Sequence, residues 1–191
     1  LFRDQINRDL QASLGQPAMR GYFCHLYING HYWGLYNTCE RPKAGHGAQY
    51  FGGKDKDYDV VKASKEGGIM ASDGSLDAWR RAYEIAREGL EKNDAYFKLQ
   101  GRTPEGELDP DSEVLIDIDN LIDYNMIIFY GGNLDAAITW FGGDRWHNNW
   151  YGMRHRSNRQ GFQFFIWDAE HTFLMRGMNQ GIEEDRTGPF P

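Results

Sequence analysis

The sequence has few cysteines, no long apolar run and no excess of basic residues. Its 191 residues include two Cys, 21 Lys and Arg, and 28 Asp and Glu, so the formal net charge is −7. Nonspecific binding to a phosphate backbone depends on surplus basic side chains. The strongest apolar run, residues 126–130, is far shorter than the roughly 18–20 residues of a membrane-spanning helix. The sequence therefore predicts no nucleic-acid partner and no membrane span.

Several catalytic motifs are also missing. The chain has no HExxH, no CxxC pair and no GxSxG, so zinc-hydrolase and serine-hydrolase chemistry lacks its usual sequence support. It has no GxGxxG phosphate loop either. Aromatic residues, in contrast, make up 15% of the chain and supply large packing units. We therefore expect a folded domain rather than a disordered chain.

The two cysteines, Cys24 and Cys39, lie on either side of an Asn-Gly pair at 29–30. If that pair forms a two-residue turn, Leu35 lies opposite Cys24. The two thiols are then too far apart for a disulfide. A longer turn would bring them together, so the redox compartment stays open.

The first part of the chain predicts two helices with strands between them. The apolar residues at helical spacing in the N-terminal helix are Phe2, Ile6, Leu10 and Leu14. Next come a predicted aromatic hairpin over 22–40, a loop over 42–57 and a strand at 58–62. A second helix is predicted over 76–90. The residues expected on its apolar face are Leu76, Trp79, Tyr83 and Leu90.

A loop at 103–112 is the expected boundary between a strand-rich N-terminal part, 1–102, and a C-terminal part, 103–191. In the C-terminal part, residues 117–130 predict a largely buried helix ended by two glycines. A polar loop then leads to a predicted hairpin over 150–167. The whole pattern predicts an α+β fold with antiparallel hairpins.

Three ionisable residues follow directly after the last apolar strand: Asp168, Glu170 and His171. Ordering such groups at the end of a buried strand is costly unless they are used. Asp168 and Glu170 are therefore candidate ligands for Mg²⁺. A turn-capping role for Asp168 remains an alternative. A metal-dependent hydrolase that uses all three side chains is a further, weaker one.

Two acids in the polar loop are candidates for a catalytic base. Asp135 follows the helix directly, whereas Asp144 lies five residues before Asn149, the interval of the D-x-x-x-x-N loop of protein kinases. Asn149 offers a neutral oxygen to a hard cation, although Asn is also common at loop ends. Position favours Asp135 and spacing favours Asp144, so both stay open.

Three charged residues of the N-terminal part are candidates for binding the nucleotide phosphates. Lys62 ends a short strand, where a lysine that neutralises phosphate charge is expected. Glu40 and Arg41 close the first hairpin and would pair with that lysine or with phosphate. The simpler interpretation is a surface ion pair with little energetic effect.

At these residues the chain resembles the CotH (spore coat protein H) kinase family of atypical, protein-kinase-like enzymes. The resemblance covers residues 18–174 and runs through YINGHYWGLYNTCERP, YFGGKDKDYDVVK, NLIDY, GGNLD, NNWY and FFIWDAEHTF. It implies one truncated kinase-like domain with a two-lobed fold and a helical C-terminal part. It also implies transfer of phosphate from ATP to hydroxyl groups of a protein substrate, with Mg²⁺ or Mn²⁺, and an extracytoplasmic or cell-surface location.

By this resemblance the catalytic acid falls on Asp135, and the metal ligands fall on Asp168 and Asn149. The chain departs from the kinase pattern, because Asp135 and Asn149 are 14 positions apart. Residues 136–146 must therefore loop out, or Asp144 must replace Asp135. The alternative function is a non-catalytic cell-surface module that binds glycans or a protein partner. The aromatic residues it would use are Trp140, Trp146, Trp150 and Tyr151.

Overall fold

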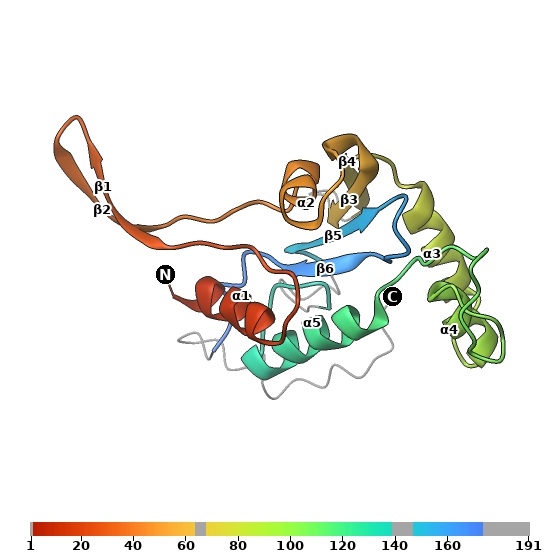
Figure 1. The fold of residues 1–191 in the computed structure, drawn as a ribbon. Helices are drawn as coiled ribbons and strands as arrows, with labels where there is room; N and C mark the ends of the chain where they lie inside the picture. The colour runs from red at the N-terminus through yellow and green to blue at the C-terminus, as the bar shows by residue number, and fades with distance from the viewer. Residues whose placement is uncertain (1, 64–67, 139–146, 174–191) are drawn as a thin grey trace. The chain divides into compact units, whose positions relative to one another are not determined.

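The structure, a computed structural model, describes residues 2–63, 68–138 and 147–173 (Figure 1). Within these residues the chain forms five α-helices, one short 3-10 helix and six strands. The strand pairs whose register is defined are antiparallel. This architecture agrees with the predicted α+β class. None of the helices in the described ranges is long and apolar enough to cross a membrane.

The chain folds as two compact units. The first unit comprises Leu1–Arg41, Asp123–Trp150 and Phe165–Pro191, and the second comprises Pro42–Ile122 and Tyr151–Phe164. The chain passes from one unit to the other inside α5 (Ile118–Gly131), β5 (Trp150–His155) and β6 (Gln163–Ile166). The loop 103–112 lies within the second unit. The division expected near residue 102 stays a prediction.

The first unit begins with α1 (Arg3–Ser13), where the sequence predicts a helix. Its buried face is polar, because the buried residues are Gln5, Asn7, Arg8 and Gln11. Three of the four apolar residues that predicted the helix are exposed, namely Phe2, Ile6 and Leu14. The apolar spacing therefore located the helix correctly but did not mark its buried face.

The aromatic hairpin of the first unit consists of β1 (Phe23–Ile28) and β2 (His31–Asn37). Its turn is the predicted Asn-Gly pair, with φ of 50° and 80°. The predicted pairing of Leu35 with Cys24 is wrong by one residue, because Leu35 pairs with His25. A bulge between Leu26 and Tyr27 shifts the register. Both cysteines are free thiols in the structure.

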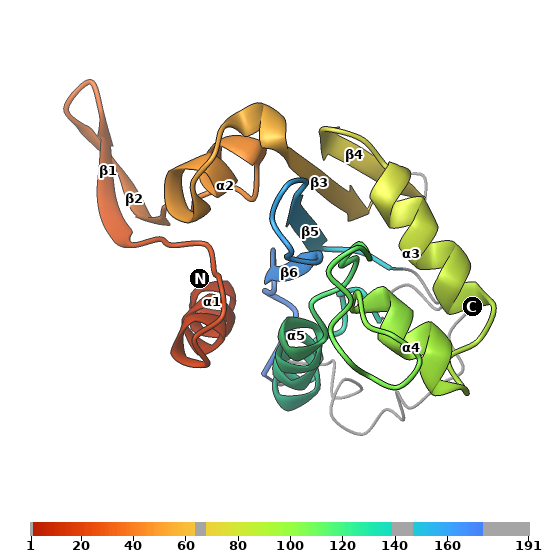
Figure 2. The same ribbon diagram turned by 45° about the vertical axis from the view of Figure 1, so that its right-hand side comes forward.

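A four-stranded sheet with the order β4-β3-β5-β6 lies mainly in the second unit. Its inner strand β3 (Tyr58–Ala63) matches the predicted strand, and β4 (Ile69–Asp73) pairs with it. The predicted hairpin over 150–167 is confirmed as β5 and β6. In both views α3 (Asp77–Arg87) lies beside α4 (Asn93–Leu99) (Figures 1 and 2). The helix α4 was not predicted from the sequence.

The segment predicted as a loop over 42–57 contains the helix α2 (Ala44–Phe51), so that prediction is wrong. Glycines normally weaken a helix. Here Gly47 permits a close approach, since a Cβ on it would lie 2.6 Å from the ring of Tyr58. The single hydroxyl hydrogen of Tyr58 is shared between the carbonyls of Gly47 (2.9 Å) and Gly52 (2.7 Å). Tertiary contact with Tyr58 thus overrides the weak local preference.

Two predicted helix faces also differ from the structure. In α3 the residues that are buried are Ala78 and Ala82, whereas Tyr83 is exposed, and so is Leu90 beyond the end of the helix. The helix α5 was expected to be largely buried. Its exposed apolar residues are Ile122, Met126, Phe129 and Tyr130. Both helices are therefore buried along narrower faces than their apolar residues predict.

Candidate catalytic and metal site

The end of α5 sets the place of Asp135. Gly132, with φ of 56°, donates its N–H to the carbonyl of Phe129 (3.1 Å), and Asn133 donates to that of Ile128 (3.0 Å). These two bonds form a Schellman cap, which ends the helix in a defined direction. The side-chain oxygen of Asn133 then accepts the N–H of Asp135 (2.9 Å). Asp135 is thus held directly after the capped helix.

Asp135 is 7% exposed, and two asparagines hold its carboxylate. Asn148 Nδ2 donates to Oδ1 (2.8 Å), and Asn149 Nδ2 donates to Oδ2 (3.0 Å). The backbone N–H of Asn148 also donates to the carbonyl of Ala136 (3.0 Å). The chain therefore returns at Asn148 to the point it left at Ala136. The separation of 14 positions does not keep Asp135 and Asn149 apart.

The strand β6 leads into the turn that carries Asp168. The carbonyl oxygen of Asp168 accepts a hydrogen bond from Asn149 Nδ2 (3.4 Å). Among the described residues, none donates a hydrogen bond to the Asp168 carboxylate or to the side-chain oxygen of Asn149. Both predicted metal ligands therefore keep oxygen atoms available for a cation.

Asp168 and Asn149 also share an unusual backbone conformation. In the described chain, four non-glycine residues have a left-handed φ: Asn29, Asn149, Asp168 and Phe173. Asn29 belongs to the hairpin turn, where that conformation is expected. The other three lie on the two segments that meet at Asp135. Left-handed φ at non-glycine residues is uncommon and concentrates at functional sites.

The electrostatics of this region favour a cation. Partial burial raises the pKa of the Asp168 carboxyl above its usual value of 3.8. Three nearby carboxylates raise the pKa further, those of Glu170, Asp4 and Asp135, whereas His171 lowers it. The Asp168 carboxyl is therefore harder to ionise beside these three carboxylates. A divalent cation would remove that repulsion.

His171 lies between two of the acids. Its Nδ1 is 3.8 Å from Asp135 Oδ2, and its Nε2 is 3.9 Å from Glu170 Oε1. The carbonyl of His171 accepts the N–H of Leu134 (3.0 Å), which ties the loop after α5 to the segment after β6. Glu170 thus lies against His171, and its role as a metal ligand stays a prediction.

The side-chain oxygens of Asp168 and Asn149 fit a metal ion that takes its remaining ligands from water or substrate. The described ranges contain no group of three or more His, Cys, Asp or Glu side chains arranged to hold a metal. Asp168 and Asn149 offer one carboxylate and one amide oxygen. Mg²⁺ typically takes one or two protein carboxylates, with waters and substrate phosphates as its other ligands. The residues therefore fit a phosphate-bound cation better than the metal centre of a hydrolase.

The remaining predicted residues lie in several places. The Arg41 guanidinium stands 5.5 Å from the ring centroid of Trp167, next to Asp168. Glu40 Oε2 accepts the backbone N–H of Arg20 (2.9 Å). Lys62 lies in the second unit, where its ammonium is 5.8 Å from the ring centroid of Tyr151. The phosphate-binding roles of these residues stay predictions, and Asp144 lies outside the described residues.

The aromatic surface expected for glycan binding is not formed as predicted. Trp150 and Tyr151 are only 4% and 2% exposed, because they belong to the buried strand β5. Trp140 and Trp146 lie outside the described residues. Exposed aromatic residues occur instead on the hairpin of the first unit, at Tyr22, Tyr27, Tyr32, Trp33 and Tyr36.

Sequence reasoning overlooked two residues around this site and the role of a third. The pair Asn148 and Asn149 stood out in the sequence, but the hydrogen bonds from both side chains to Asp135 were not predicted. Asp4 and Asn7 contact Ala169, the residue after Asp168. In the sequence these residues belong to a polar stripe at helical spacing, on the face of α1 opposite the apolar residues that predicted the helix.

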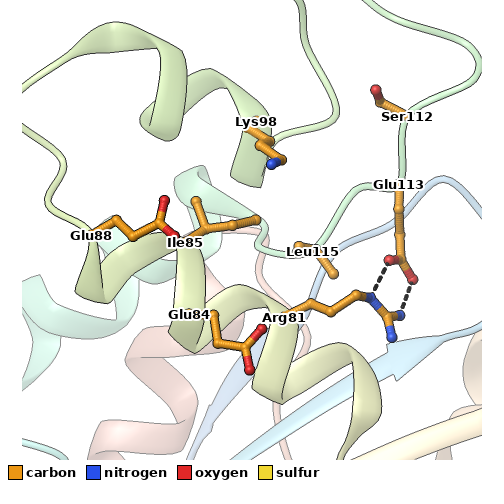
Figure 3. Close-up of a pocket in the computed structure, with 8 residues that line it drawn as sticks. All are labelled: Arg81, Glu84, Ile85, Glu88, Lys98, Ser112, Glu113 and Leu115. Atoms are coloured by element: carbon orange, nitrogen blue, oxygen red, sulfur yellow. Dashed lines mark hydrogen bonds and ion pairs between the residues drawn. The ribbon is translucent and has the colours of Figure 1, made fainter.

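A hollow of about 300 Å³ lies in the second unit, and none of the predicted site residues lines it (Figure 3). Its lining residues are Arg81, Glu84, Ile85, Glu88, Lys98, Ser112, Glu113 and Leu115. The two-pronged hydrogen bond from Arg81 to Glu113 forms one wall (Figure 3). The hollow therefore reflects the packing of α3, α4 and the loop before α5.

Comparison with known proteins identifies a family. The model of a family described as CotH kinase protein matches residues 1–189 of the 191-residue chain. No curated protein matches the chain. The matched range includes every residue of the candidate site.

Proposed function

The chain belongs to the CotH kinase family, and from this premise we propose that it transfers the γ-phosphoryl group of ATP to a side-chain hydroxyl of a protein substrate. A protein-kinase-like, two-lobed fold is part of the proposal. The observation that carries it is the meeting of Asp135, Asn149 and Asp168 from two separate loops. Phosphoryl transfer requires mainly such positioning and charge stabilisation.

Asp135 is the proposed base. A carboxylate oxygen accepts more than one hydrogen bond, so an oxygen that already receives an asparagine N–H can also receive a hydroxyl. The substrate oxygen gives its proton to Asp135 as it bonds to the γ-phosphorus. The bond from that phosphorus to the bridging oxygen breaks, and ADP leaves. Asn148 and Asn149 keep the carboxylate oriented during this step.

Asp168 and Asn149 are the residues that would hold Mg²⁺ or Mn²⁺. When bound, the ion neutralises charge on the β- and γ-phosphates. Arg41 is proposed to add positive charge beside this site. In support, its guanidinium lies 5.5 Å from the ring centroid of Trp167, the residue before Asp168. Lys62 is proposed to neutralise phosphate as well, on the strength of the family likeness.

Phosphoryl transfer from γ-labelled ATP tests this function, with the full chain, Mn²⁺ and casein as a generic acceptor. We expect label in casein or in the chain itself. Asp168→Ala and Asp135→Ala should each lower the rate by about 10²–10⁴-fold, the range typical of acid–base catalysis. Asp119→Asn is the matched control, because this exposed carboxylate lies on α5 outside the site. A wild-type chain that neither binds ATP nor labels any acceptor contradicts the proposal.

The exposed aromatic residues of the β1–β2 hairpin favour a second candidate function, a non-catalytic binding module. Five aromatic side chains near or on this hairpin are 44–69% exposed. No charged residue occurs between Arg20 and Glu40, so recognition there would rest on stacking and backbone contacts. Retention of a glycan or protein partner by the Asp168→Ala variant, with no labelling by wild type, would favour this candidate.

We also propose a location outside the cytoplasm or at the cell surface, which rests on the family likeness alone. Cell fractionation with an antibody against the full protein tests it. Recovery of the protein only with cytoplasmic markers would contradict it.

A further inference from the structure

The buried face of α1 is directed at the turn that carries Asp168. Asp4 Oδ1 accepts the N–H of Ala169 (2.8 Å). Asn7 Nδ2 donates to the carbonyl of Arg3 within the helix (2.7 Å), and its second hydrogen is shared between Thr172 Oγ1 (3.1 Å) and the carbonyl of Ala169 (3.4 Å). Two side chains of one helix therefore hold both polar backbone groups of the residue that follows Asp168.

The same helix holds the strand before the turn. Gln11 is fully buried, and its Oε1 accepts the N–H of Ile166 (3.0 Å). Thr172 Oγ1 donates to the carbonyl of Ala169 (3.2 Å) and closes the turn from its other end. Contacts to α1 thus begin two residues before Asp168 and end four residues after it.

Asp4 is itself held in place by Arg8. Arg8 Nε lies 2.9 Å from Asp4 Oδ2 as an ion pair, although the angle is not that of a hydrogen bond. The guanidinium also donates to Asn37 Oδ1 (2.5 Å) and to the carbonyl of Met19 (3.4 Å). Burying an arginine is costly unless its donors are satisfied. This arrangement leaves Asp4 little freedom to turn away from Ala169.

The turn needs such support because Asp168 has φ of 51°. An L-residue gains no intrinsic stability in that conformation, so surrounding contacts must maintain it. If the Ala169 peptide were released, Asp168 could relax to a commoner conformation and its carboxylate would change direction. A metal ligand that changes direction binds its ion more weakly.

We propose, building on the proposed function, that Asp4 and Asn7 are positioning residues for the metal site. They fix the Ala169 peptide and thereby keep the Asp168 carboxylate in the direction needed for a divalent cation. Neither residue is a ligand in this proposal. Asp4 acts as a hydrogen-bond acceptor, and Arg8 keeps it oriented.

Binding of Mn²⁺ to the full chain without nucleotide, measured by water-proton relaxation or calorimetry, tests the proposal. Asp4→Ala and Asn7→Ala should each weaken Mn²⁺ binding by about 10–100-fold, as is usual when a partner of a metal ligand is lost. Asp4→Asn retains an oxygen acceptor for Ala169 but loses its charge pairing with Arg8, so it should weaken Mn²⁺ binding clearly less than Asp4→Ala does. Asp9→Asn is the control, since Asp9 is exposed on the same helix and, within the described ranges, accepts a hydrogen bond from Gln5 alone.

Two results would overturn the proposal. One is wild-type affinity in both Asp4→Ala and Asn7→Ala. The other is equal weakening in Asp4→Asn and Asp4→Ala, which would assign the effect of Asp4 to its charge rather than to its hydrogen bond. Circular dichroism and melting temperature of each variant separate loss of affinity from loss of fold.

Hydrogen exchange of the Ala169 amide tests the same idea without any metal. We expect exchange to be at least about tenfold faster in Asp4→Ala than in wild type or Asp4→Asn, because the amide loses its acceptor. The amides of Val60 and Val61 in β3 serve as an internal reference. Unchanged Ala169 exchange in Asp4→Ala overturns the proposal. If the wild-type chain binds no Mn²⁺, the proposed function loses its metal site, while this measurement still decides whether α1 holds the turn.

Discussion

Asp168 combines two features that are unfavourable without a cation. Its carboxylate lies near other carboxylates, which raise its pKa, and no described residue donates a hydrogen bond to it. Such an arrangement costs stability in the metal-free protein. Stability is sacrificed in this way at sites where the group has a function.

The substitution Asp168→Asn should therefore stabilise the metal-free protein at neutral pH. Asparagine tolerates the left-handed backbone and carries no charge to repel the neighbouring acids. We expect the melting temperature in EDTA to rise by about 1–3 °C, as for a stabilisation below about 1 kcal/mol. Added Mn²⁺ should raise the melting temperature of wild type and leave that of Asp168→Asn unchanged. A lower melting temperature of the variant in EDTA would show that the carboxylate has a partner in the native fold.

The two adjacent asparagines should have separable roles. Asn148 contacts the carboxylate of Asp135, whereas Asn149 contacts that carboxylate and the carbonyl of Asp168. We expect Asn148→Ala to lower kcat about tenfold with little change in the KM for Mn·ATP. Asn149→Ala should lower kcat and raise this KM.

Labelling rates at varied Mn·ATP measure both constants. An Asn148→Ala variant with raised KM and unchanged kcat would contradict the roles assigned, because it would place Asn148 on the metal rather than on the base.

At the scale of elements, local sequence predicted the type of most helices and strands but not which face each one buries. The helix α1 shows the reason. Its apolar spacing identified a helix, yet the buried contacts come from Asp4, Asn7, Arg8 and Gln11, whose partners lie as far as 165 positions away. Hydrogen bonds between distant segments leave no periodic pattern in a sequence. The polar stripe becomes meaningful only when its partners are known.

The candidate site shows the same limit. The order of helix, polar loop, hairpin and strand-end Asp was visible in the sequence, and so was the competition between Asp135 and Asp144. Spacing alone could not show that Asn148 returns to Ala136 and joins Asp135 to Asn149. The closing of this loop depends on tertiary contacts, which residue spacing does not reveal. Similarly, α2 exists because Gly47 packs against Tyr58, which no local preference indicates.

Glu113 provides a pH-dependent link between elements of the second unit. It accepts hydrogen bonds from Arg81 (2.9 and 2.8 Å; Figure 3). Arg154 of β5 lies 2.7 Å away as an ion pair. Burial alone would raise the pKa of Glu113, but the hydrogen bond from Arg81 and the charges of Arg154 and Arg81 outweigh it and lower the pKa below 4.5. A lowered folded-state pKa means that ionised Glu113 stabilises the fold above the unfolded-state pKa.

The substitution Glu113→Gln should destabilise the protein at pH 7 by about 1–2 kcal/mol, because the buried Arg154 loses its carboxylate partner. The difference in unfolding free energy between the variant and wild type should shrink as the pH falls below about 4.5. It should be smallest below the lowered pKa, because Glu113 is then protonated in both the folded and the unfolded state. Urea unfolding at pH 7 and pH 3 measures it. Asp77→Asn is the control, since its ion pair with Arg80 is exposed on both sides. An equal loss of stability at both pH values would assign the effect to packing instead of charge.

At the scale of the whole molecule, the net charge of −7 is compatible with the divalent cation that the proposed kinase function requires. An acidic protein attracts divalent cations and repels polyanions such as nucleic acids. The acids of the candidate site all belong to the first unit, although they come from three separate parts of the chain. A ligand that binds these acids therefore stabilises segments of the first unit that lie far apart in the sequence.

Mn·ATP should consequently raise the thermal stability of the whole chain. A ligand that binds only the folded state at 100 times its Kd stabilises by about 2.7 kcal/mol. For a chain of this size that corresponds to a rise in melting temperature of about 5–10 °C. EDTA should reverse the rise, and Asp168→Ala should abolish it.

Hydrogen exchange identifies where this stabilisation acts. We expect added protection in segments 1–41, 123–138 and 147–150 and after residue 165, because the residues proposed to hold the metal and to act as base belong to the first unit. Should the two units unfold in separate transitions, the transition of the first unit should move by at least as much as that of the second. Protection confined to 42–122 and 151–164 would place the nucleotide away from Asp135, Asn149 and Asp168. That outcome would refute the site, even if the chain proved to be a kinase.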